Sequence, residues 1–183
     1  MNPKPPKPRK CKSCRTEYVP QRMGQVACSP PCALEIAKGK REKAERAQDK
    51  VKRVKLMTLS DWRKKAQAAF NAWIKARDAD EPCVSCGRHH QGQYHAGHYL
   101  STGARPELRF DEANVHKQCQ PCNTHLHGNL VMYRAELIRR IGIAEVNRLE
   151  GPNPPRHDTA DSLRELAATY RAKTRQLKKD SDT

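Results

Sequence analysis

The cysteines constrain this chain more than any other feature of its sequence. All 8 fall into two groups of four, spaced C-x2-C-x13-C-x3-C and C-x2-C-x32-C-x2-C. The first group is Cys11, Cys14, Cys28 and Cys32, and the second is Cys83, Cys86, Cys119 and Cys122. Two such pairs supply the four tetrahedral thiolate ligands of structural zinc. The spacing therefore predicts two structural Zn²⁺ ions in closed sites that stabilise the fold and do not catalyse a reaction.

Two other uses of paired cysteines fit the sequence less well. A disulfide framework belongs to secreted proteins, and the N-terminal segment MNPKPPKPRK has no apolar stretch behind it that would make a signal peptide. A redox C-x-x-C opens a helix within a βαβ pattern, which surrounds neither group. The chain also lacks a run of about 18 apolar residues. We therefore expect no membrane span and a cytoplasmic location.

The charge of the chain indicates its class of partner. Lys and Arg number 36 against 20 Asp and Glu, which gives a formal net charge of +16. A soluble chain with this charge favours a polyanion, and nucleic acid is the first candidate. Because only 36% of the residues are hydrophobic, a single large core is not expected. The sequence therefore predicts small, zinc-stabilised modules that bind nucleic acid.

The chain divides into five predicted segments. Residues 1–10 alternate Pro with Lys and Arg and should form a disordered basic arm. Residues 11–37 form the N-terminal zinc module, either treble-clef-like or ribbon-like, and residues 38–59 form a basic helical connector. Residues 60–150 form a second zinc-knotted domain. Residues 151–183 are a linker and a C-terminal helix, which is expected to fray within KKDSDT.

Apolar residues recur at helical spacing in three places. Ser60 is the expected N-cap of the first helix, whose stripe should pack against the second cysteine group and consists of Trp62, Ala66, Ala69, Phe70 and Trp73. A second helix should begin near Cys122 and end at Gly142, with the stripe Leu130, Tyr133, Leu137 and Ile141. The C-terminal helix has the stripe Leu163, Leu166, Ala167 and Tyr170.

The basic connector carries most of the cations that we expect to contact phosphates. Glu and Lys at helical spacings indicate an exposed helix, which is either a DNA-contacting strut or a solvated spacer. The DNA-binding candidates are Lys40, Arg41, Lys50, Lys52, Arg53 and Lys55, together with Arg105 from the second domain.

Segments between the second set of cysteines resemble the zinc-knotted HNH, or His-Me finger, nucleases. These segments are YHAGHYLSTG and LRFDEANVHKQC. More narrowly, FNAWIKARDADEPCVSCG, HAGHYLSTG, LRFDEANVHKQCQPCN and GNLVMYRAELIRRIG resemble the NinG/Rap family of lambdoid phage recombination proteins, over most of residues 60–145. The resemblance implies an α+β fold with a ββα finger and flanking helices. It also implies a phage-encoded endonuclease that hydrolyses branched recombination intermediates, such as D-loops and Holliday junctions.

The resemblance also implies roles for three residues. His98 matches the general base, because neutral imidazole can take a proton from water near pH 7. Asn114 matches the asparagine that ties the loop to the strand and orients the histidine. Asn123 matches the helix residue that offers oxygen to a catalytic Mg²⁺ or Mn²⁺ ion. If these residues are not catalytic, Asn114 is a turn residue and Asn123 is a helix cap. The histidines are then surface or structural residues. His116 is a weaker candidate than His98 for a catalytic role.

The sequence departs from the HNH pattern at one position. Many HNH enzymes have an acidic metal ligand directly before the histidine, where this chain has Gly97. His95 falls on the same strand face as Gly97, and we hypothesise that its side chain reaches over the glycine to the ion. His127 and Asp111 are further ligand candidates.

Two other functions stay open at this point. A non-catalytic, zinc-dependent DNA-binding protein would explain the charge, the zinc sites and the missing acid. An RNA-binding zinc protein would explain the charge and the zinc sites, but gives no reason for His98, Asn114 and Asn123 to occur together. As partners we expect branched DNA and other recombination proteins, with a dimer left open.

Overall fold

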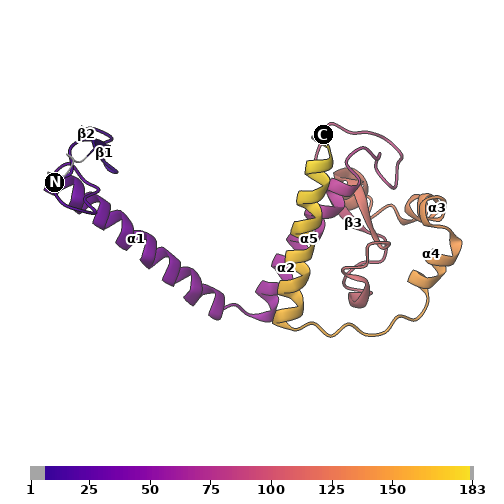
Figure 1. Ribbon diagram of the computed structural model, residues 1–183. Coiled ribbons are helices and arrows are strands. Elements are labelled where there is room, and N and C mark those ends of the chain that lie inside the picture. The colour runs from indigo at the N-terminus through magenta and orange to yellow at the C-terminus, as the bar shows by residue number, and fades with distance from the viewer. Residues whose placement is uncertain (1–6, 182–183) are drawn as a thin grey trace. The chain divides into compact units, whose positions relative to one another are not determined.

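The computed structural model describes residues 7–181. The chain divides into two compact units, and the boundary in the sequence lies between Met57 and Thr58 (Figure 1). Helices and two small two-stranded sheets make up an α+β fold, as predicted. Among residues 7–181, none of the helices is both long enough and apolar enough to cross a membrane.

The first unit begins with a short hairpin around the first cysteine group. Strands β1 (Arg9–Lys10) and β2 (Glu17–Tyr18) pair in antiparallel register. Arg9 and Lys10 were expected in a disordered arm, but this pairing orders them, and the Cys11 amide donates to the Thr16 carbonyl at 2.9 Å. Residues 1–6, the rest of the predicted arm, lie outside the described residues.

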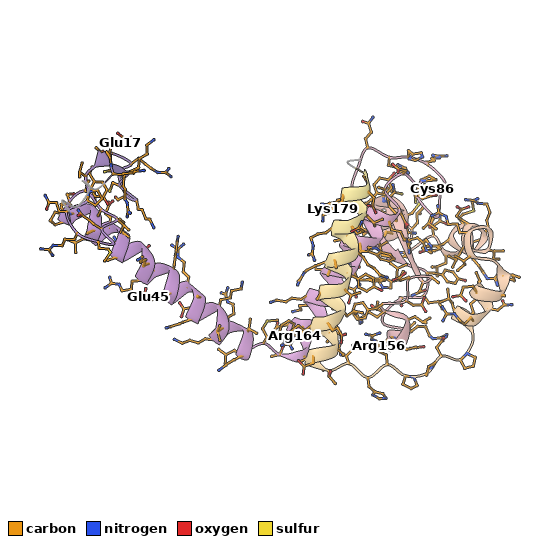
Figure 2. The ribbon with its side chains drawn as sticks, in the orientation of Figure 1. Glu17, Glu45, Cys86, Arg156, Arg164 and Lys179 are labelled. Atoms are coloured by element: carbon orange, nitrogen blue, oxygen red, sulfur yellow. The ribbon has the colours of Figure 1, made fainter. Side chains whose placement is uncertain are left out.

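Helix α1 (Pro30–Lys55) follows directly. It begins inside the predicted zinc module and not at residue 38, because Pro30 and Pro31 occupy its first positions, where proline favours a helix start. Cys32 therefore lies in the first turn. None of the α1 residues is buried, and Glu45 points away from the helix towards solvent (Figure 2).

The second unit begins with α2 (Leu59–Arg77), which is capped by Thr58 and not by Ser60. The Thr58 hydroxyl accepts from the Asp61 amide while the Asp61 carboxylate accepts from the Thr58 amide, a capping box that Ser60 does not form. Helix α2 lies alongside α5 (Ala160–Ser181) (Figure 1). The apolar stripe of α2 therefore packs mainly on α5 and the central hairpin, and not on the cysteine group.

The central hairpin consists of β3 (Tyr94–His98) and β4 (Val115–Cys119), paired in antiparallel register. One face, with Ala96 and Val115, packs against the α2 and α5 core. The other face carries Gly97, whose carbonyl accepts from the Tyr133 hydroxyl at 2.9 Å. The loop between the strands contains the short helix η1 (Pro106–Leu108).

The chain after β4 is less regular than predicted. The helix expected from Cys122 onwards is broken into the π-helix η2 (Pro121–His125) and helix α3 (Leu130–Ile141), because His127, Gly128 and Asn129 all adopt left-handed backbone angles. Gly142, with φ +81°, ends α3 as predicted. A further helix, α4 (Ile143–Glu150), was not predicted. Helix α5 runs on to Ser181, so residues 178–181 of KKDSDT are helical and not frayed as expected; residues 182–183 lie outside the described residues.

Candidate functional site

Each cysteine group gathers its four sulfur atoms in one place. In both groups the ligand atoms all lie within 4.8 Å of one another. The individual Sγ–Sγ distances include 3.5 Å for Cys14 and Cys28 and 4.0 Å for Cys86 and Cys119. Four sulfurs at about 2.3 Å from a tetrahedral zinc ion are separated by about 3.8 Å. The donor chemistry and spacing therefore fit one zinc ion in each group, which we call the N-terminal knot and the central knot.

The central knot joins the hairpin to the segments on either side of it. Cys119 ends β4, Cys122 lies in η2, and Cys83 and Cys86 come from the turn before β3 (Figure 2 labels Cys86). The Cys119 amide donates to Cys83 Sγ at 3.3 Å, as expected for a thiolate ligand. His90 Nε2 lies 3.2 Å from Cys86 Sγ. An ion here therefore fixes the start of η2 relative to the hairpin.

An ion pair fastens the end of α2 to β4. Arg77 binds Asp78 through two contacts of 2.6 and 2.9 Å and also donates to the carbonyls of Glu112 and Val115. Asp78 accepts in turn from the Lys117 amide at 2.9 Å. Burial alone would raise the pKa of Asp78, but the Arg77 guanidinium outweighs this effect and lowers the pKa. The hairpin is thus held on a rigid support.

His98 has the arrangement of a proton acceptor. Its Nε2 lies 3.0 Å from the Arg109 carbonyl, and because a carbonyl only accepts, Nε2 must carry the hydrogen. The neutral ring therefore has its lone pair on Nδ1. Burial, the largest influence, lowers the pKa of His98; the hydrogen bond to Arg109 opposes this shift and the Arg109 charge reinforces it. The neutral, proton-accepting form is therefore favoured at pH 7.

Asn114 fastens the loop that supplies this carbonyl. The side chain is fully buried; its Oδ1 accepts from the Leu100 amide at 2.9 Å, and its Nδ2 donates to the carbonyls of Leu100 and Leu108 at 3.0 and 3.2 Å. Leu108 directly precedes Arg109. Asn114, which directly precedes β4, therefore ties Leu100 and Leu108 of the loop to the start of β4, next to the acceptor of His98.

His116 is a buried residue of the opposite face of the hairpin. Its Nδ1 lies 3.4 Å from the hydroxyl of Tyr133, which itself donates to Gly97. Burial, followed by the charge of Arg77, lowers the pKa of His116 to about 4. These contacts give His116 a packing role.

The space over Gly97 is filled from the neighbouring strand. A Cβ at position 97 would overlap Oε1 of Gln118 and come within 2.9 Å of the Gln118 Cβ. The fully buried Gln118 carboxamide donates through Nε2 to Ser85 Oγ and to the Gly128 carbonyl, both at 2.6 Å. Glycine is therefore required at position 97 by this close approach.

The remaining ligand candidates differ in their surroundings. His95 lies on the same hairpin face as Gly97, as predicted, and its buried Nε2 has no partner among residues 7–181. Asn123 is half-buried in η2, and His127 is exposed. The Asp111 carboxylate is engaged by the Ala113 amide and by Arg148. The structure therefore brings His98 and Asn114 together, while the metal-binding roles of His95, Asn123 and His127 stay predictions.

The DNA-binding candidates fall into two groups. Those of the connector are exposed on α1: Lys40, Arg41, Lys50, Lys52, Arg53 and Lys55. The Arg105 guanidinium is instead engaged by Glu107 and by the carbonyls of Glu150 and Gly151. Arg105 is thus the least available of the candidates.

Sequence reasoning missed several residues that shape this site. Gln118 and Ser85 were not singled out, and nothing in their local pattern distinguishes them from ordinary strand and turn residues. Tyr133 was expected only as a residue of an apolar helical stripe, and the hydrogen bond of its hydroxyl to Gly97 was not expected. The Arg109 carbonyl is a backbone group, which no sequence pattern identifies.

Known proteins resemble this chain over almost its whole length. The family model described as "Bacteriophage Lambda NinG protein" matches residues 3–180. Protein ninG of Salmonella phage P22 is 42% identical over 190 residues, covering 93% of this chain and 94% of the relative. Protein ninG of Escherichia phage lambda is 41% identical over 193 residues, covering 94% and 95%. No solved structure matches. A match of this extent shows that the chain belongs to the NinG family of bacteriophage proteins.

Proposed function

We propose that the protein is an endodeoxyribonuclease that hydrolyses branched DNA. The observation that carries the proposal is the arrangement of His98, whose Nε2 is held by the Arg109 carbonyl so that Nδ1 can accept a proton. The pattern of His98, Asn114 and Asn123 within a zinc-knotted hairpin supports the same reading. A positioned base of this kind accelerates phosphodiester hydrolysis by taking the proton of the attacking water.

The proposed mechanism uses a water molecule as nucleophile. Nδ1 of His98 takes one proton from the water as its oxygen bonds to phosphorus, and the bond between phosphorus and one ester oxygen breaks. The departing oxygen takes a proton from solvent. Asn114 keeps Leu108 in place, so the adjacent Arg109 carbonyl holds the imidazole in one orientation and one tautomer.

A divalent ion, Mg²⁺ or Mn²⁺, would neutralise the charge of the scissile phosphate and of the leaving oxygen when bound. Asn123 and His95 are the residues that would hold it. An orphaned buried nitrogen on His95 fits a ligand role, since buried polar atoms nearly always have a partner.

We further propose that α1 binds the phosphate backbone without reading sequence. Its exposed cations would each neutralise a phosphate and release counterions. Discrimination of a branch from a duplex would then come from shape.

The test compares zinc-loaded wild type with His98→Ala and, as a matched control, His157→Ala in the exposed linker. Zinc content and binding to a labelled four-way junction are measured first. Nicking is then assayed with and without Mg²⁺ or Mn²⁺. We expect wild type and His157→Ala to nick the junction, while His98→Ala binds it without cleavage.

One observation favours a second candidate, a non-catalytic zinc-dependent DNA-binding protein. A neutral carboxamide from Gln118 fills the space where an acidic side chain at position 97 would lie. If wild type binds the junction and does not nick it with either ion, this second function replaces the first. Competition with structured RNA distinguishes DNA from RNA as the preferred partner.

A further inference from the structure

Two buried polar atoms on one face of the central hairpin lack a hydrogen-bond partner among residues 7–181. They are Nε2 of His95 and Oε1 of Gln118. Buried polar groups in folded proteins are almost always paired, with protein atoms or with a small bound species. Two orphaned atoms on one face therefore indicate that something binds there.

The two side chains are cross-strand neighbours. His95 stands directly opposite Gln118 in the β3–β4 register. Residues opposite each other in an antiparallel pair project from the same face, with Cβ atoms about 4.5–5.5 Å apart. A single small ligand is therefore within reach of both.

The carboxamide orientation of Gln118 is fixed by its partners. Its nitrogen is 2.6 Å from the Gly128 carbonyl, which can only accept. The oxygen must then be the atom on the other side, over Gly97, where the absence of a side chain leaves it room. Oε1 thus presents lone pairs at the end of β3, beside the residue that precedes His98.

The chemistry of the two atoms selects the ligand. A carboxamide oxygen offers only lone pairs, and an imidazole nitrogen offers one when the hydrogen is on the other ring nitrogen. An electron-pair acceptor satisfies both atoms. Imidazole favours transition metals, whereas Mg²⁺ prefers an all-oxygen environment. A divalent ion such as Mn²⁺ fits this pair better than Mg²⁺.

We propose that His95 Nε2 and Gln118 Oε1 are two protein ligands of a divalent transition-metal ion, of the Mn²⁺ class, beside Gly97. The assignment of this ion to catalysis rests on the proposed nuclease function, but its binding does not. Because Gly97 and His98 are consecutive, an ion here would lie at the same end of the hairpin as the proposed base, on the face opposite to the one that carries the His98 side chain.

Binding is measured without DNA, by electron paramagnetic resonance of free Mn²⁺ over zinc-loaded protein. His95→Ala is the primary variant, since no hydrogen bond of the His95 side chain joins it to the described residues. His89→Ala, an exposed histidine of the same domain, is the matched control. We expect one Mn²⁺ per wild-type chain, unchanged affinity in His89→Ala and an affinity about tenfold or more lower in His95→Ala. Absence of wild-type binding, as a buried water would give, or an unchanged His95→Ala affinity overturns the proposal.

Two substitutions of similar length test Gln118. Gln118→Met removes both Oε1 and Nε2, whereas Gln118→Glu removes only Nε2 and keeps an oxygen ligand. We expect Gln118→Met to weaken Mn²⁺ binding and Gln118→Glu to bind Mn²⁺ more tightly than Gln118→Met, at equal zinc content. A Gln118→Glu variant that binds no better than Gln118→Met contradicts the role of Oε1. Mn²⁺ binding without nicking would instead refute the proposed nuclease function alone.

Discussion

Asn114 is a fully buried polar residue whose side chain holds the loop between β3 and β4, so its removal should destabilise the second unit. Asn114→Ala deletes three hydrogen bonds, from the Leu100 amide and to the carbonyls of Leu100 and Leu108. The Leu108 carbonyl still accepts from the Asp111 amide at 3.1 Å, so only the Leu100 amide and carbonyl lose their partner. Each buried backbone group left without a partner costs roughly 1–3 kcal/mol, and partial access of water to Leu100, which is only half-buried, reduces this cost. We therefore expect the free energy of unfolding to fall by about 2–4 kcal/mol, a large part of the 5–15 kcal/mol typical of a domain.

The loss is measured by urea unfolding of zinc-loaded protein, followed by tryptophan fluorescence. Both Trp residues, Trp62 and Trp73, lie in α2, so the signal reports the second unit alone. Asn71→Ala is the control, because the Asn71 side chain makes one hydrogen bond among the described residues: its Oδ1 accepts from Gln67 Nε2 on the same helix at 2.8 Å. We expect the control to change stability by less than about 0.5 kcal/mol. A loss below about 1 kcal/mol in Asn114→Ala would show that the loop is held by other contacts.

Three further outcomes are expected. Cys86→Ser should remove the zinc ion of the central knot, which lowers the zinc content to one ion per chain, and should unfold the second unit. Cys14→Ser should remove the zinc ion of the N-terminal knot and leave the tryptophan fluorescence unchanged. Metal analysis together with tryptophan fluorescence measures both outcomes. The pKa of His116 is about 4 in the folded chain and 6.5 in the unfolded chain, so the unfolded chain binds a proton more readily. The free energy of unfolding therefore falls as the pH drops from about 6.5 to about 4, by roughly 1 kcal/mol at pH 6 and about 3 kcal/mol in full. His116→Gln should remove this pH dependence, which urea titrations of both proteins at several pH values would measure. Replacing Lys50, Lys52 and Arg53 together by Gln should make the slope of log K for DNA against log salt less steep by about 0.9 per lost phosphate contact, and an unchanged slope would exclude α1 from the interface.

The parts of the fold that followed from sequence are those set by local spacing. The two cysteine groups were recognisable because zinc imposes short, fixed separations on its ligands. The stripes of α2 and α5 were recognisable because burial of one helix face repeats every three or four residues. The end of α3 at Gly142 was predictable because a left-handed residue favours glycine.

The parts that did not follow depend on contacts between distant residues. The fit of Gln118 over Gly97 arises only once β3 and β4 pair in this register. The acceptor of His98 is a backbone carbonyl, so its position depends on the fold of the whole 99–114 loop. The break at residues 127–129 places His127 and Asn129 in left-handed conformations that their own preferences do not dictate. Tertiary hydrogen bonds from Gln118 and Ser85 to Gly128 hold that turn.

The position of Cys32 in the first turn of α1 links metal binding to the order of the connector. A helix without buried residues depends on its own nucleation, and starting a helical turn is unfavourable by a factor of about 10⁻³, or roughly 4 kcal/mol. Zinc in the N-terminal knot fixes that first turn in advance. The 26 residues of α1 can then propagate as a rod about 39 Å long. Loss of this one ion would turn α1 into a flexible chain with the same charge. Such a chain would lose more conformational entropy when it binds a phosphate backbone than the ordered helix does.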